Sequence, residues 1–92
     1  MKNNTSILVA DDEPDLRNIC RDALETSGYN IFEASDGKEA LQLLQEQDID
    51  LVLSDIRMPK MDGIQLLNEI VQQKLDVDFI IITGFGSIET AV

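Results

Sequence analysis

The sequence predicts an α/β domain with a parallel sheet that carries helices on both of its faces. Residues 7–10 and 79–82 are short apolar runs without polar alternation, which is typical of strands buried on both sides. Between such runs, apolar residues recur three and four positions apart, which indicates amphipathic helices. Strands that alternate with helices connect through right-handed crossovers, so a doubly wound sheet is expected.

The first half of the chain is expected to contain two strand–helix units. The strand at residues 7–10 precedes a helix that begins near Pro14, a residue favoured in a first turn, and ends at Gly28, a common C-terminal cap. A weaker strand at 29–34 precedes a helix that Asp36 caps, with an acid three positions on as in a capping box. The residues expected on the apolar faces of these helices are Leu16, Ile19, Cys20, Ala23 and Leu24, then Ala40, Leu41 and Leu44.

The second half repeats this pattern. A strand at 51–55 is followed by a loop that holds Pro59 and Gly63, and then by a helix. The strand at 79–83 is the most hydrophobic, glycines interrupt it, and Ser87 is placed to cap one more helix. The helix after Gly63 is expected to direct Ile64, Leu67, Ile70 and Val71 inward.

Length, charge and cysteine content narrow the classes of function. A chain of 92 residues allows one small domain. The net charge of −11 disfavours binding to nucleic acid or to an anionic membrane surface. The single cysteine, Cys20, excludes an intrachain disulfide. No signal peptide and no apolar run of about 20 residues is present, so a cytoplasmic location is expected.

Acidic residues stand where the first and third strands end. Ligands of open α/β sheets bind beyond the carboxyl ends of the strands, so Asp11, Asp12 and Asp55 would meet if these strands are neighbours. Carboxylates without histidine or cysteine favour a hard ion such as Mg2+ or Mn2+, which would assist phosphoryl transfer to Asp55. Acidic residues near a helix N-terminus also stabilise the helix without any metal, and we give Glu13 and Asp15 this structural role.

Four segments resemble the response regulator receivers of bacterial two-component systems. They are ILVADDEP at 7–14, ASDG at 34–37 leading into EAL at 39–41, DIRMPKMDG at 55–63, and IITG at 81–84. The third matches the pattern D-x-x-M-P-x-M-x-G of that family. The resemblance implies a flavodoxin-like fold with strand order 2-1-3-4, in which residues 1–92 form one receiver domain that lacks its fifth strand and last helix.

The resemblance also implies roles for individual residues. Asp55 would be the phosphoacceptor, taking its phosphoryl group from a phosphohistidine on a sensor histidine kinase or a phosphotransfer protein. Asp12, Asp55 and the backbone carbonyl of Arg57 would bind Mg2+, with Asp11 helping through water. Thr83 would turn its hydroxyl towards the phosphoryl oxygens and act as a switch that controls an output.

One part of the family pattern has no counterpart in the chain. The fifth strand of receivers ends in a lysine that pairs with the phosphoryl group, and neither Lys60 nor Lys74 stands at the matching place. We therefore expect the native protein to be longer than this chain. Without a fifth strand, the strand at 79–82 would form an apolar edge, which invites dimerisation or strand exchange.

Three other classes of function stay open beside the signalling phosphoacceptor, which has no separate substrate to turn over. The first is a pseudo-receiver that acts only as an interaction module. The second is a Mg2+-dependent phosphotransferase or phosphatase with an aspartyl phosphate, although haloacid-dehalogenase-like enzymes want D-x-D where this chain has adjacent Asp11 and Asp12. The third is a flavodoxin-like mononucleotide binder, which needs a phosphate loop where this chain has acids.

Overall fold

The computed structural model describes residues 5–82 of the chain. Strands and helices alternate along these residues, as predicted. The elements are β1 (Ser6–Ala10), α1 (Pro14–Thr26), β2 (Asn30–Ala34), α2 (Gly37–Glu46), β3 (Leu51–Ser54), α3 (Gly63–Gln72) and β4 (Asp78–Ile81). Among the elements described, no helix has the length and hydropathy that a membrane span requires.

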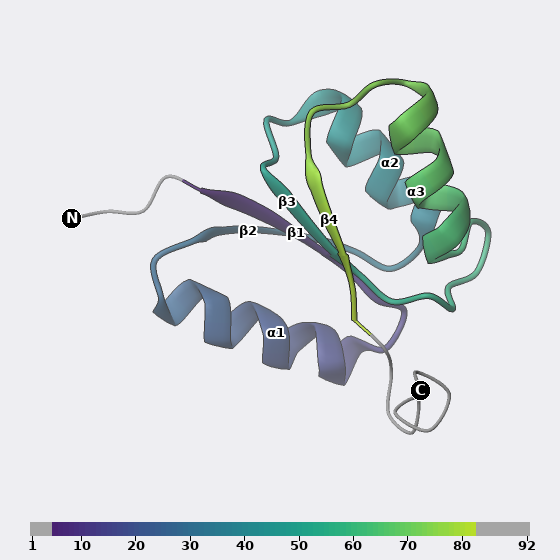
Figure 1. The fold of residues 1–92 in the computed structure, drawn as a ribbon. Helices are drawn as coiled ribbons and strands as arrows, with labels where there is room; N and C mark the ends of the chain where they lie inside the picture. Colours follow the sequence, from purple (N-terminus) through teal and green to yellow (C-terminus); the bar gives the residue numbers. More distant parts are fainter. Residues whose placement is uncertain (1–4, 83–92) are drawn as a thin grey trace, which may run out of the picture.

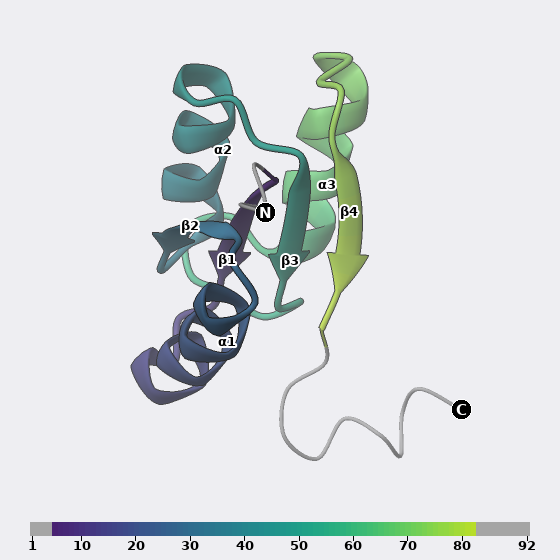
Figure 2. The ribbon, with the colours of Figure 1, turned by 90° about the vertical axis from the view of Figure 1, so that its left-hand side faces the viewer.

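The strands form one parallel sheet in the order β2-β1-β3-β4 (Figures 1 and 2). The predicted doubly wound, flavodoxin-like architecture and its strand order are therefore confirmed. Because β1 and β3 are neighbours, with Ala10 level with Ser54, the segments that follow them leave the sheet side by side.

The helices divide unequally between the two faces of the sheet. Figure 2 shows α2 and α3 together on one face and α1 alone on the other. The larger part of the core lies under α2 and α3, where Leu8, Val52 and Leu66 are fully buried. Burying one such side chain contributes roughly 1.5–3 kcal/mol, so this layer dominates the apolar stabilisation of the fold.

Helix α1 begins and ends where its sequence predicts, but its apolar face is only partly covered. Pro14 is its first residue, and Gly28 follows it with a φ of 94°. The prediction that Ile19 and Ala23 belong to the buried stripe is wrong, because both are exposed, Ile19 by 63%. The physical reason is that α1 packs against β1 and β2 at one side of the sheet. Only Leu16, Cys20 and Leu24 of the expected stripe are half-buried.

Helix α3 presents a different face to the sheet from the one expected. Leu66 and Ile70 are buried, whereas Ile64 and Val71 are 46% and 66% exposed, so the prediction for these last two is wrong. Positions 63, 66 and 70 form one stripe, and Ile64 and Val71 each lie about 100° further round the helix. Leu67 is half-buried, at the edge of that stripe.

The helix starts depend on side-chain caps. The Asp36 carboxylate accepts the N–H of Glu39 at 2.8 Å, as predicted. The Glu39 carboxylate, however, accepts the N–H of Ser35 at 2.8 Å, so no reciprocal box forms at α2. The reciprocal box is at α3, where Asp62 Oδ1 accepts the N–H of Gln65 at 2.8 Å and Gln65 Oε1 accepts that of Asp62 at 3.0 Å.

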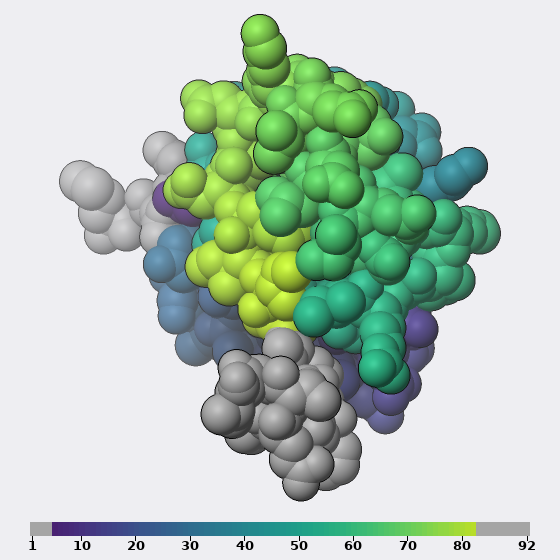
Figure 3. Space-filling model, turned by 45° about the vertical axis from the view of Figure 1, so that its right-hand side comes forward, coloured from purple at the N-terminus to yellow at the C-terminus, as the bar shows by residue number. Residues whose placement is uncertain are grey.

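Strand β4 is the edge of the sheet within the described residues. Figure 3 shows β4 beside α3 on this face of the molecule. Ile80 is 50% exposed, so β4 is not buried on both faces as β1 is. The predicted switch residue Thr83 and the helix cap Ser87 lie outside the described residues.

Candidate metal centre

The structure brings together three acidic side chains from the tips of two neighbouring strands. Asp11 and Asp12 follow β1, and Asp55 follows β3. The N–H of Asp55 donates to the carbonyl of Ala10 at 2.9 Å, which continues the ladder between these strands by one bond. Each carboxylate offers one oxygen, and these oxygens all lie within 4.8 Å of one another.

Asp11 is the buried member of this group. Only 3% of it is exposed, and its Oδ1 accepts the N–H of Glu13 at 2.9 Å. Burial raises the pKa of Asp11, an effect that the hydrogen bond from Glu13 opposes and the nearby negative charge of Asp55 reinforces. The ionised form of Asp11 is therefore less favoured than that of an exposed aspartate, and a cation nearby would stabilise it.

Asp12 and Asp55 are open to solvent to different degrees. Asp12 is exposed and Asp55 is half-buried. The Oδ1 of Asp55 accepts the N–H of Ile56 at 2.7 Å, which fixes the orientation of its carboxylate. An ion can thus reach the group from the side of Asp12, while the local backbone holds Asp55 in place.

An open depression of about 630 Å³ lies beside the acidic group. Asp12 is at its edge, and Arg57 lies in the same lining. This places Arg57 near the acids, as its predicted role requires, although the ligand role of its carbonyl stays a prediction. The other lining residues are Ile56, Met58, Pro59 and Asp62.

The backbone around Asp55 is tightly supported. The hydroxyl of Ser54, which is fully buried, donates to the carbonyl of Asp55 at 2.8 Å. The N–H of Gly63 donates to the carbonyl of Ile56 at 2.7 Å and so ties the start of α3 to the loop after Asp55. The sequence pattern placed Gly63 between a loop and a helix and gave no sign of this contact.

Two cationic side chains, Lys60 and Arg17, differ in how they relate to the acidic group. The ammonium of Lys60 lies 3.7 Å from the Asp36 carboxylate at the start of α2, so its contact is with a different acid. The guanidinium of Arg17 donates to the carbonyl of Asp11 at 2.7 Å. No sequence pattern pointed to Arg17; the available signal was a lone cation one turn into the helix that follows the acids.

The residues present suit a hard divalent cation. Carboxylate oxygens are the ligands that Mg2+ and Mn2+ prefer, and two of these acids are open to solvent. Like charges this close disfavour joint ionisation unless a cation lies among them. The donor set therefore fits the expected metal, and a bound cation would relieve the repulsion among the three carboxylates.

Comparison with known families agrees with this geometry. A family model described as the response regulator receiver domain matches residues 7–92. The chain belongs to the response regulator receiver family. The response regulator SaeR of Staphylococcus aureus (strain USA300) is 42% identical over 80 residues, which are 87% of this receiver and 35% of SaeR. This receiver thus spans about a third of the length of that relative.

Solved receivers share the fold over nearly the whole chain. The receiver domain of the Francisella response regulator 1452 is 34% identical and superposes with a TM-score of 0.85, covering 95% of this chain and 72% of the other. The response regulator TrrA of Thermotoga maritima, solved in complex with Mg2+ and BeF, is 35% identical. Its TM-score is 0.83, with 96% of this chain and 76% of that chain covered.

Proposed function

We propose that this receiver accepts a phosphoryl group on Asp55, with Mg2+ held by Asp12 and Asp55. The observation that carries the proposal is the convergence of three carboxylates within 4.8 Å at the adjacent tips of β1 and β3. The donor would be a phosphohistidine on a sensor histidine kinase or a phosphotransfer protein. The Mg2+ complex of TrrA supports this choice of metal.

The chemistry that we assign to Asp55 is a nucleophilic displacement. A carboxylate oxygen of Asp55 attacks phosphorus, the phosphorus–nitrogen bond of the phosphohistidine breaks, and its electron pair leaves with the imidazole. A Mg2+ ion held by Asp12 and Asp55 would supply positive charge that neutralises the phosphoryl oxygens. The hydrogen bond from the N–H of Ile56 to Asp55 holds the carboxylate in one orientation for the attack.

The remaining residues have subsidiary roles in this proposal. Asp11 is buried and its Oδ1 is engaged by Glu13, which supports a contribution through water rather than direct ligation. The carbonyl of Arg57 supplies a further ligand from the depression beside Asp12. The hydroxyl of Thr83 would face the phosphoryl oxygens and couple the site to an output, as in the family pattern; this residue lies outside the part of the chain that the structure describes.

The proposed receiver is a signalling element without turnover of a separate substrate. We expect it to be cytoplasmic, to act with a sensor kinase and to control an output. We also expect no contact with nucleic acid or membrane, and dimerisation or strand exchange through the β4 edge. These expectations stay predictions. The pseudo-receiver is the leading alternative, because the lysine that pairs with the phosphoryl group in the family pattern has no counterpart in this chain. An aspartyl-phosphate phosphotransferase is the less favoured alternative.

Incubation with Mg2+ and acetyl phosphate tests the proposal. We expect intact-mass spectrometry to detect a labile phosphoryl adduct that EDTA and Asp55→Asn abolish and that Asp12→Asn reduces strongly. Asp62→Asn is the matched control, because Asp62 lines the same depression and asparagine preserves its helix cap. Absence of an adduct would favour the pseudo-receiver, and repeated turnover of a second phosphate ester would favour the phosphotransferase.

A further inference from the structure

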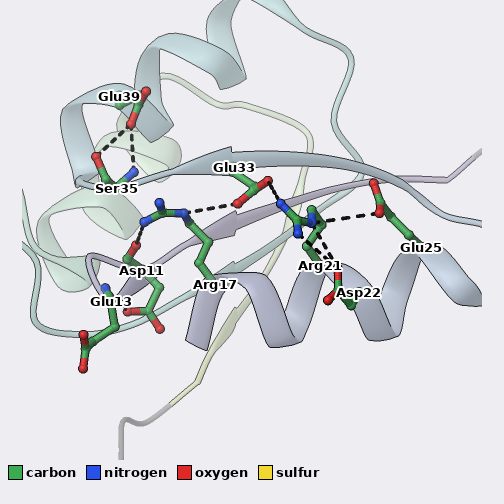
Figure 4. A network of polar contacts seen from close by, with 9 residues as sticks. All are labelled: Asp11, Glu13, Arg17, Arg21, Asp22, Glu25, Glu33, Ser35 and Glu39. Atoms are coloured by element: carbon green, nitrogen blue, oxygen red, sulfur yellow. Dashed lines mark hydrogen bonds and ion pairs between the residues drawn. The ribbon is translucent and has the colours of Figure 1, made fainter. Parts of the chain in front are cut away.

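Arg17 connects the loop of the acidic site to a neighbouring strand. It lies in α1, and its side chain is 19% exposed. Its Nη1 donates to the carbonyl of Asp11 at 2.7 Å, and its Nε donates to Glu33 Oε1 at 3.2 Å (Figure 4). A guanidinium is planar and its donors point in fixed directions, so one contact constrains the other.

The backbone of Asp11 is held from two sides. Its N–H donates to the carbonyl of Ala34 at 3.0 Å, which extends the β1–β2 ladder by one bond. Its carbonyl accepts from Arg17, as Figure 4 shows, and its carboxylate accepts from the N–H of Glu13. The hydrogen bond from Arg17 thus engages the carbonyl of the peptide between Asp11 and Asp12, and the Cα of Asp12 belongs to this same peptide.

We propose that Arg17 is a positioning residue that keeps Asp11 and Asp12 within reach of Asp55 for metal binding. This inference rests on the proposed function, since it concerns the same site. The positive charge of Arg17 does not oppose the metal directly, because Glu33 pairs with it. What Arg17 supplies is a fixed geometry of the junction between β1 and α1.

Arg21 provides a matched control one helical turn further on. Its contacts within the described residues are with Asp22 at 3.1 Å, Glu25 at 4.0 Å and Glu33 at 3.2 Å. Arg21 thus shares Glu33 with Arg17, has the same charge and lies in the same helix, but its contacts do not extend to Asp11. A change at Arg21 removes one cation and its ion pairs with Asp22, Glu25 and Glu33, while it leaves the contact of Arg17 with the loop in place.

The direction in which Arg17→Gln changes metal affinity distinguishes a positioning role from a purely electrostatic one. If Arg17 acted only as a nearby cation, Arg17→Gln would strengthen metal binding, because it removes a positive charge from an acidic region. If Arg17 positions the loop, the same change weakens metal binding. Residues that orient metal ligands without touching the metal typically affect affinity by about 10–100-fold.

The experiment is a Mn2+ titration of the full chain, with free Mn2+ followed by electron paramagnetic resonance and Mg2+ measured by competition. We expect Arg17→Gln to weaken binding by about tenfold or more. Arg17→Lys, which keeps the charge but loses the fork of donors, is expected to weaken it too. Arg21→Gln is expected to bind as tightly as the wild type or slightly more tightly. Thermal unfolding in EDTA shows that each variant is folded at the titration temperature.

The outcomes distinguish this inference from the proposed function. Metal binding by the wild type that Asp12→Asn abolishes, together with unchanged or tighter binding by Arg17→Gln, overturns the role of Arg17 and leaves the site standing. Equal losses in Arg17→Gln and Arg21→Gln also overturn it, because they indicate a general loss of stability. Should Arg17→Gln fail to fold, Arg17→Lys decides by the same criterion. No binding by the wild type overturns both proposals.

Discussion

Gly63 lies directly against the backbone of Asp55. A Cβ atom at position 63 would collide with the carbonyl oxygen of Asp55 and lie 3.1 Å from the Cα of Ile56. The first residue of α3 is therefore packed against the loop that carries the proposed phosphoacceptor. The absence of a side chain at this point lets the helix approach the site closely.

Gly63→Ala is expected to destabilise the fold and to impair the site together. Since backbone atoms must move to admit the methyl group, we expect a loss of about 1–3 kcal/mol in the free energy of unfolding. We also expect slower formation of the Asp55 adduct from acetyl phosphate. Urea denaturation and intact-mass kinetics measure the two effects. Ile64→Ala, at an exposed neighbouring position, is the control and should change little; equal effects in both variants would contradict the steric argument.

Asp11→Asn is expected to stabilise the metal-free chain at neutral pH. Burial and neighbouring charges raise the pKa of Asp11 above its ordinary value, so the folded chain binds this proton more tightly than the unfolded chain. The stability from this difference is fully present below the ordinary pKa and is lost as pH rises through the raised pKa. Asparagine avoids that loss and retains an oxygen for the N–H of Glu13.

The measurement is denaturant unfolding in EDTA at pH 7 and at about pH 3, below the ordinary aspartate pKa. The gain from Asp11→Asn should appear at the higher pH and vanish at the lower one. Asp15→Asn, which changes an exposed acid in the first turn of α1, is the control and should lose a few tenths of a kcal/mol. A gain that is the same at both values of pH would show that charge is not its cause.

Leu66 and Val71 test the orientation of α3 against the sheet. Leu66 is fully buried and belongs to the main core, whereas Val71 is 66% exposed. Leu66→Ala should therefore cost about 2–5 kcal/mol in the free energy of unfolding. Val71→Ala should stay within about 0.5 kcal/mol. A larger loss from Val71→Ala than from Leu66→Ala, measured by urea denaturation, would mean that the helix faces the sheet as the sequence alone suggested.

Asp62 is expected to matter for stability through the cap of α3. Its carboxylate accepts a hydrogen bond from the N–H of Gln65, and the side-chain oxygen of Gln65 accepts one from the N–H of Asp62. Asp62→Ala should cost about 1 kcal/mol, because a backbone donor loses its partner. Asp62→Asn keeps an acceptor and should cost much less. Thermal unfolding of both variants provides the comparison, and equal losses would assign the effect to the charge of Asp62 instead of its hydrogen bond.

Much of the fold follows from local pattern, because strands and helices differ in the period of their apolar residues. The runs at β1 and β3, Pro14 at the start of α1 and the cap at Asp36 each predicted an element that the structure contains. The strand order could not be predicted from local pattern, because periodicity carries no information on which strands are neighbours. It was predicted from the resemblance to receivers.

The candidate site was predictable to the same extent. Acids after two strands indicated that Asp11, Asp12 and Asp55 would meet if β1 and β3 lie side by side, and they do. Their different exposures were not predictable, because the burial of Asp11 depends on atoms that other elements bring to it. The roles of Arg57 and Thr83 stay predictions.

By itself, the sequence determined the order of strands and helices, their approximate bounds and the chemical groups at the strand tips, since these depend on neighbours in the chain. Only the tertiary structure decided which side of α3 meets the sheet, how far Ile19 is exposed and that Arg17 contacts the carbonyl of Asp11. These depend on the packing of segments distant in sequence, where the rotation of a helix by one residue exchanges buried positions for exposed ones.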